Sequence, residues 1–206
     1  MAFPTTDSPG ELQAVNQILA SVGQAPVTTL EQTNPDVAIA YNTLQQVSRE
    51  VQAEGWTFNK EYHYPLTPDS NNEFVIPSNM LQIDLCNIEY YNRDKDPVRR
   101  DGKLYDRNKH SFEWEQKVHY FDVTWFFDWD DLPMPIRDYI TARAATFVAM
   151  RIVGDPNLYQ VLQQQEAYMR SNALEYETQQ GDYTFFGQPL SGNYYNSYQP
   201  FHALYR

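Results

Sequence analysis

The sequence predicts an α+β protein with a four-helix body formed by N- and C-terminal helix pairs, an inserted antiparallel β domain and an extended aromatic C-terminal tail. Three observations lead to this prediction. Apolar residues recur at three- and four-residue steps near both ends of the chain, as on amphipathic helices. The middle of the chain alternates apolar with polar residues and is rich in β-branched and aromatic side chains. The last stretch has neither period.

The predicted boundaries follow these changes of pattern. Residues 1–55 form the N-terminal helix pair, residues 56–131 the β domain, residues 132–181 the C-terminal helix hairpin, and residues 182–206 the arm. A chain of 206 residues is long enough to bury about 70% of its unfolded surface.

Helix starts and stops are clear in the N-terminal pair. Ser8-Pro9-Gly10-Glu11 reads as a capping box, and Gly23 with Pro26 ends the helix that follows. Asn34-Pro35-Asp36 begins a second helix, for which Gly55 is the natural C-terminal residue. The expected buried stripes are Leu12, Val15, Ile18, Leu19 and Val22 in the first helix and Val37, Tyr41, Leu44, Val47 and Val51 in the second.

The β domain begins after Gly55. Alternating residues predict strands around Tyr62–Leu66 and Leu81–Leu85. Asp101-Gly102 between Val98 and Tyr105 predicts a hairpin with a type I′ turn. The stretch from Val118 to Phe127 is apolar on both faces, which predicts the central strand.

The C-terminal pair is separated by a very short connection, so its helices must fold back on each other. Asp131 or the Leu132-Pro133 pair caps the first helix, and Gly154 ends it. Asp155 caps the second, which Gly181 ends. The first helix carries a stripe of Ile136, Ile140, Ala144, Phe147 and Val148 and a small-residue face of Ala142, Ala145 and Ala149; the second carries Leu158, Leu162, Met169, Ala173 and Tyr176. We interpret the stripes as core, and Gln163–Glu166 as a solvated or subunit-facing side.

Composition excludes several functions. The formal charge of −12 at pH 7 argues against nonspecific nucleic-acid binding, although DNA could pass an acidic wall without sticking. Cys86 is the single cysteine, so neither an intrachain disulfide nor a thiolate metal cluster is expected. The first residues lack a signal peptide's features, and no apolar run reaches the roughly 18 residues of a membrane span. We expect a soluble protein made in a cytoplasm.

A search for chemistry finds one weak enzyme candidate. The histidines His63, His110, His119 and His202 lack metal-ligand spacing, and we expect neither a metal nor another cofactor. No nucleophile motif or phosphate-binding loop occurs. Carboxylates beside indoles do suit a glycan hydrolase, in which an acid and a base flank a sugar stacked on Trp. These residues are Glu113, Trp114, Glu115, Asp122, Asp128, Trp129, Asp130 and Asp131. Acidic residues before a helix are more usually solvated and favoured by its dipole.

Two segments are candidate partner contacts. The run from Arg93 to Lys109 is a local net-positive stretch in an acidic chain, and Arg99, Arg100 and Lys103 surround its hairpin turn. It is either a charge-mixed hairpin that avoids edge aggregation or a contact for an acidic neighbour. The arm either wraps its own body or docks on another protein. Its candidate contact residues are Tyr194, Tyr195, Tyr198 and Phe201.

Four sequence segments together resemble tail tubular protein A of short-tailed bacteriophages, a head-to-tail adaptor also called gatekeeper. They are ELQAVNQILASVGQAPVTTLE at residues 11–31, GWTFN at 55–59, LYDR at 104–107 and LPMPIRDYITARAATFV at 132–148. The resemblance covers about residues 10 to 180.

The resemblance implies a structural protein of the virion tail, made in the host cytoplasm and without catalytic motif or membrane segment. It implies a ring, of twelve subunits in that family, which docks beneath the portal protein and carries the tail nozzle, tail tubular protein B. DNA would pass through the lumen without specific binding. The alternatives are a tail-associated glycan hydrolase and a monomeric scaffolding factor.

Overall fold

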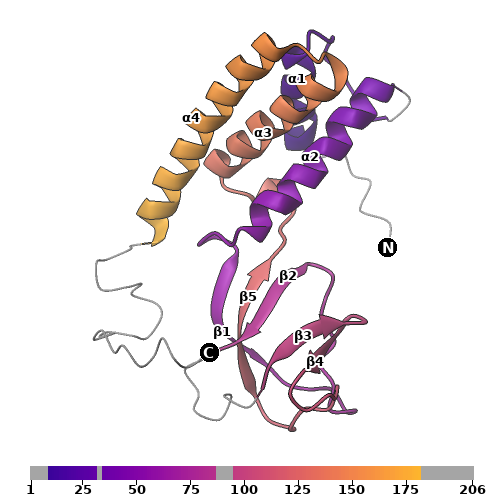
Figure 1. Ribbon diagram of the computed structural model, residues 1–206, viewed down its shortest axis with the longest axis vertical. Coiled ribbons are helices and arrows are strands. Elements are labelled where there is room, and N and C mark those ends of the chain that lie inside the picture. Colours follow the sequence, from indigo (N-terminus) through magenta and orange to yellow (C-terminus); the bar gives the residue numbers. More distant parts are fainter. Residues whose placement is uncertain (1–8, 32–33, 87–94, 182–206) are drawn as a thin grey trace. The chain divides into compact units, whose positions relative to one another are not determined.

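The computed structural model describes residues 9–31, 34–86 and 95–181 (Figure 1). It confirms the α+β class, with four helices packed together and small antiparallel sheets. The predicted C-terminal arm lies outside the described residues. The elements are α1 (Pro9–Ser21), α2 (Pro35–Ala53), β1 (Lys60–Leu66), β2 (Met80–Leu85), β3 (Pro97–Arg100), β4 (Lys103–Asp106), β5 (His119–Trp125), the 3-10 turn η2 (Trp129–Asp131), α3 (Met134–Ile152) and α4 (Pro156–Gly181).

Two compact units divide the described residues. The helical unit contains the described residues up to Asn59, the short segment Asn79–Gln82 and Thr124–Leu174. The β unit contains Lys60–Ser78, Ile83–Val123 and the described residues from Glu175 onward.

The predicted caps of α2 and α4 are confirmed and that of α3 is corrected, whereas Ser8, the predicted cap of the first helix, lies outside the described residues. The Asn34 side chain accepts a 3.0 Å hydrogen bond from the Asp36 backbone N–H, and Asp155 accepts one of 2.9 Å from Asn157. The predicted cap of α3 is wrong for Asp131, which lies in η2. Pro133 holds the N-cap position without a side-chain hydrogen bond.

The centre of the helical unit is α3, which lies between α4 and α2 (Figure 1). Both α1 and α2 pack closely against it. The predicted small-residue face is buried, and this lets neighbouring helices approach. The predicted core stripe of α3 is wrong at Phe147, which is 37% exposed and has the Arg143 guanidinium 5.8 Å from its ring centroid. The fully buried residues of α3 are Ile136, Tyr139, Ile140, Ala144 and Val148.

The Tyr139 side chain connects three helices. Its hydroxyl accepts hydrogen bonds from Arg143 at 3.0 Å and from Arg170 of α4 at 2.9 Å. Both guanidinium groups also lie near Glu54 at the end of α2, at 3.6 and 3.5 Å. The Trp56 indole packs edge-on against the Tyr139 ring, with centroids 6.5 Å apart. Charged groups at the rim therefore hold α4, which buries only Leu162 and Ala173 among its described residues.

Two buried amides join the end of α2 to the chain around the end of β5. The Gln52 side chain accepts from the Phe127 N–H at 2.8 Å and donates to the Phe127 carbonyl at 3.1 Å. The Asn59 amide donates to the carbonyls of Gln52 and Trp125, each at 2.8 Å, and accepts from the Trp56 N–H at 2.8 Å. Gly55, at φ +79°, makes the turn between them. The GWTFN segment is thus a hydrogen-bonded joint.

The β unit contains a three-stranded sheet with the order β1-β5-β2 and the separate β3-β4 hairpin. The predicted central strand is confirmed as β5. Its faces differ, however: His119, Phe121 and Val123 are buried, whereas Tyr120 is 37% exposed. The hairpin pairs Arg100 with Lys103, and positive φ angles at Asp101 (49°) and Gly102 (73°) confirm the type I′ turn.

Replacing Asn59 by Ala removes the three hydrogen bonds of its side-chain amide and leaves their partners buried. We expect the free energy of unfolding to fall by about 2–3 kcal/mol. Asn42→Ala is the matched control, because Asn42 is exposed on α2 and such changes stay within about 0.5 kcal/mol. Urea unfolding followed by circular dichroism measures both. Equal midpoints for the two variants would show that the joint is dispensable.

Candidate interaction surfaces

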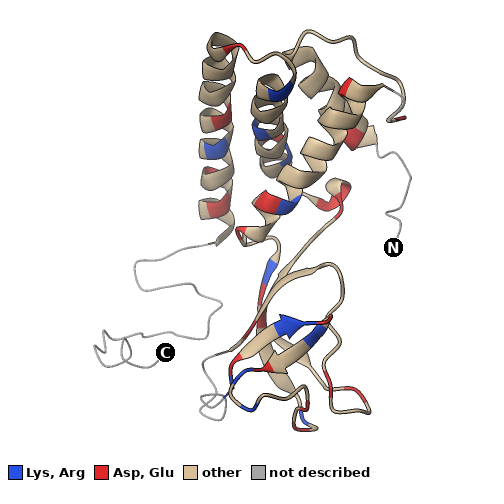
Figure 2. Cartoon of the chain, turned by 45° about the vertical axis from the view of Figure 1, so that its right-hand side comes forward, with Lys and Arg blue, Asp and Glu red and all other residues tan. Residues whose placement is uncertain are grey.

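The β3-β4 hairpin carries the three predicted contact residues Arg99, Arg100 and Lys103 close to its turn (Figure 2). Arg99 and Arg100 are exposed, and Lys103 is partly buried. Lys103 Nζ lies 2.5 Å from Glu73 Oε2, and this hydrogen bond raises the pKa of Lys103. The Arg100 guanidinium lies 4.1 Å from the centroid of the Tyr105 ring. The hairpin thus presents a stacked, pre-oriented arginine at its surface.

Several basic residues of this stretch are used within the β unit. Arg107 pairs with Asp96. Lys95 Nζ is buried, 3.7 Å from Glu115 and 5.8 Å from the centroid of the Trp114 ring, and burial lowers its pKa. The outward positive surface is therefore smaller than the sequence indicated. Arg93 and the four aromatic contact residues of the arm, Tyr194, Tyr195, Tyr198 and Phe201, lie outside the described residues.

A second surface lies on α4 and was not singled out from the sequence. Val161 and Tyr168 are 62% and 64% exposed and lie two turns apart, on one flank of the helix. The core stripe passes through Leu162 and Ala173, so this apolar pair is out of phase with it. Both could have been found in the sequence by looking for apolar residues of this helix that lie outside its core stripe. We call Val161 and Tyr168 the α4 flank.

The glycan-hydrolase interpretation of the two indoles is wrong. Trp114 is 5% and Trp129 is 7% exposed, so neither ring can stack a sugar. Trp114 packs edge-on against Phe74 and His119, with centroids 5.5 and 5.7 Å away, and Trp129 belongs to the helical core. A hydrogen bond with Lys117 lowers the pKa of Glu115, whereas a general acid needs a raised one.

A shallow hollow of about 450 Å³ lies over α1. Among the described residues, its lining contains no carboxylate, histidine or cysteine. It is lined by Pro9, Leu12, Gln13, Asn16, Gln17 and Ala20. Among the described residues, no helix is both long and apolar enough to cross a membrane.

Comparison with known proteins gives one consistent result. The family model described as tail tubular protein matches residues 12–183. The chain is also 26% identical over 164 residues to tail tubular protein A of Klebsiella phage KP34, an alignment that covers 77% of this chain and 82% of that protein. The family match runs from α1 to just past the end of α4, so it includes both the helices and the sheets.

The buried His119 ring makes stability pH-dependent. Burial lowers the pKa of His119, so the folded ring stays neutral where the unfolded ring takes up a proton. The free energy of unfolding should therefore fall as pH drops from about 6.5 towards the lowered pKa, by at most about 1.4 kcal/mol per pH unit. His119→Gln should remove this slope, and exposed His110→Gln should keep it. Urea titrations across this range measure the difference; identical slopes for both variants would refute it.

Proposed function

Because the chain belongs to the tail tubular protein family, whose members are structural components of phage tails, we propose that it is a head-to-tail adaptor. In this proposal its copies close into a ring, of twelve subunits, between the capsid portal protein and the tail nozzle formed by tail tubular protein B. The observation that carries the proposal is the family match over residues 12–183.

The α4 flank supports a contact between neighbouring copies. A helix in water gains most of its stability by packing an apolar face, yet only two described residues of α4 are buried. Val161 and Tyr168 lie outside that face, and aromatic residues of this kind are enriched at protein interfaces. The occupant we propose is a second copy of this chain. Contacts between different surfaces of identical subunits generate a ring when their rotation closes.

Charge supports the rest of the arrangement. The stacked Arg100 and its neighbour Arg99 suit an acidic surface, and a chain with a formal charge of −12 supplies one on each adjacent copy. The same negative charge keeps a DNA duplex moving through the lumen without specific binding. The aromatic arm, with Tyr194, Tyr195, Tyr198 and Phe201, is proposed to reach the portal protein or a neighbouring copy.

Sedimentation velocity tests ring formation, with the tag-free chain measured alone and mixed with the portal ring from the same genome. We expect the mixture to give a heavier species whose added mass equals about a dozen chains, as the proposed ring requires. The double variant Val161→Glu and Tyr168→Glu should prevent this species, because carboxylates would be buried at the α4 flank.

The matched control is Gln160→Glu with Ala167→Glu. These residues are also exposed and two turns apart on α4, but each precedes a residue of the α4 flank by one position, which turns its side chain about 100° around the helix. The control should assemble as the wild type does, and both variants should keep the wild-type unfolding midpoint. A wild-type chain that stays separate from the portal ring contradicts the adaptor function. Assembly unaffected by the first double variant contradicts the role of the α4 flank.

A further inference from the structure

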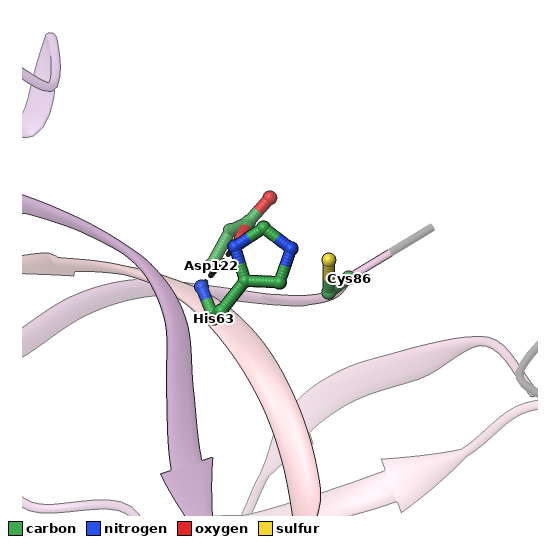
Figure 3. A group of neighbouring side chains, drawn as sticks. All are labelled: His63, Cys86 and Asp122. Atoms are coloured by element: carbon green, nitrogen blue, oxygen red, sulfur yellow. Dashed lines mark hydrogen bonds between the residues drawn. The ribbon is translucent and has the colours of Figure 1, made fainter. Parts of the chain in front are cut away.

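Three side chains with metal-ligand chemistry meet on the β unit's three-stranded sheet (Figure 3). They are His63, Cys86 and Asp122, and their ligand atoms all lie within 4.8 Å of one another. His63 belongs to β1, Asp122 to the central strand β5, and Cys86 directly follows β2. Strand order, not sequence spacing, brings them together, so their separation in the sequence concealed the group.

Local hydrogen bonds fix the backbone of the group. The His63 backbone N–H donates to Asp122 Oδ1 at 3.2 Å, and the Cys86 backbone N–H donates to the Tyr120 carbonyl at 3.1 Å. Cys86 is 2% exposed, whereas His63 and Asp122 are partly exposed. The group is therefore shielded on the thiol side and open to solvent on the other, so an ion can enter.

We propose that His63, Cys86 and Asp122 bind one Zn²⁺ ion per chain. Imidazole nitrogen, thiolate sulfur and carboxylate oxygen are the three ligand types that Zn²⁺ uses in proteins, whereas Ca²⁺ and Mg²⁺ prefer oxygen ligands alone. A tetrahedral Zn²⁺ site places ligand atoms about 3.5 Å apart. Rotation of side chains closes the remaining gap from the observed spacing. Water fills the fourth position. On binding, the Cys86 thiol releases its proton to solvent and becomes the thiolate ligand, and a protonated His63 ring releases one proton to become neutral imidazole.

The geometry favours a metal site over a nucleophile triad. In a triad the carboxylate accepts a hydrogen bond from the imidazole ring and so orients it. Here Asp122 instead accepts the backbone N–H of His63. No hydrogen bond from within the described residues engages either ring nitrogen of His63. Bound Zn²⁺ would pin β1, β5 and the end of β2 together. This inference does not depend on ring assembly.

Calorimetric titration of the full-length, tag-free chain with ZnCl₂, after removal of metals by a chelator, tests the proposal. We expect one site per chain and a thermal unfolding midpoint that rises with Zn²⁺ concentration. Titration with Co²⁺ should give a thiolate-to-cobalt charge-transfer band, which reports Cys86 directly. His63→Asn, Cys86→Ala and Asp122→Asn should each lower the affinity by more than the roughly tenfold that loss of an outer-shell partner costs.

His110→Asn is the matched control. His110 and His63 have similar left-handed backbones, with φ of 54° and 58°, and Asn tolerates that conformation. The control should bind Zn²⁺ as the wild type does. If Cys86→Ala fails to fold, the Zn²⁺ affinities of His63→Asn and Asp122→Asn decide whether the proposal holds. A wild-type chain without a stoichiometric site overturns the proposal. Zn²⁺ binding unchanged by His63→Asn and Asp122→Asn also overturns it, because the ion would then be held elsewhere.

Discussion

The buried amides of Gln52 and Asn59 hold the end of α2 against the residues around the end of β5, and so connect two distant segments of the helical unit. Each amide both donates and accepts, so it fixes backbone groups on two segments far apart in the sequence. The joint also places Trp56 against Tyr139, whose hydroxyl collects the guanidinium groups of α3 and α4. Buried amides of this kind are costly to leave half satisfied, which makes the arrangement specific. The two helix pairs therefore share one hydrophobic core, although the β strands separate them in the sequence.

Much of the fold could be predicted because local chemistry determines it. Asn34, Asp155 and Asp101-Gly102 act through neighbours in the sequence, and the structure confirms all three. Predictions failed where distant packing decides. Phe147 has the period of a core residue, but it lies at the surface beside Arg143. The indoles beside carboxylates suggested a cleft, yet both rings are buried because each completes a hydrophobic core. The group of His63, Cys86 and Asp122 depends on strand order, which spacing does not reveal.

The weakly buried helix α4 connects the fold to its proposed role. A helix held mainly by rim charges and two buried residues leaves apolar side chains available for another copy. In and beside the hairpin, in contrast, basic side chains form ion pairs within the β unit: Lys103 with Glu73 and Arg107 with Asp96. What remains is a small surface around Arg99 and Arg100. The proposed contacts are therefore of two kinds, an apolar one on α4 and a charged one on the hairpin.

Electron cryomicroscopy of tails from virions that carry this chain tests the central claim most directly. The account predicts a single closed ring of this chain between the portal protein and the tail nozzle, with Val161 and Tyr168 of α4 buried against the neighbouring copy. Density for the chain at another position in the particle, or as isolated copies without contacts between them, would contradict the adaptor function. A closed ring in which the α4 flank faces solvent would instead contradict the subunit contact proposed for that helix.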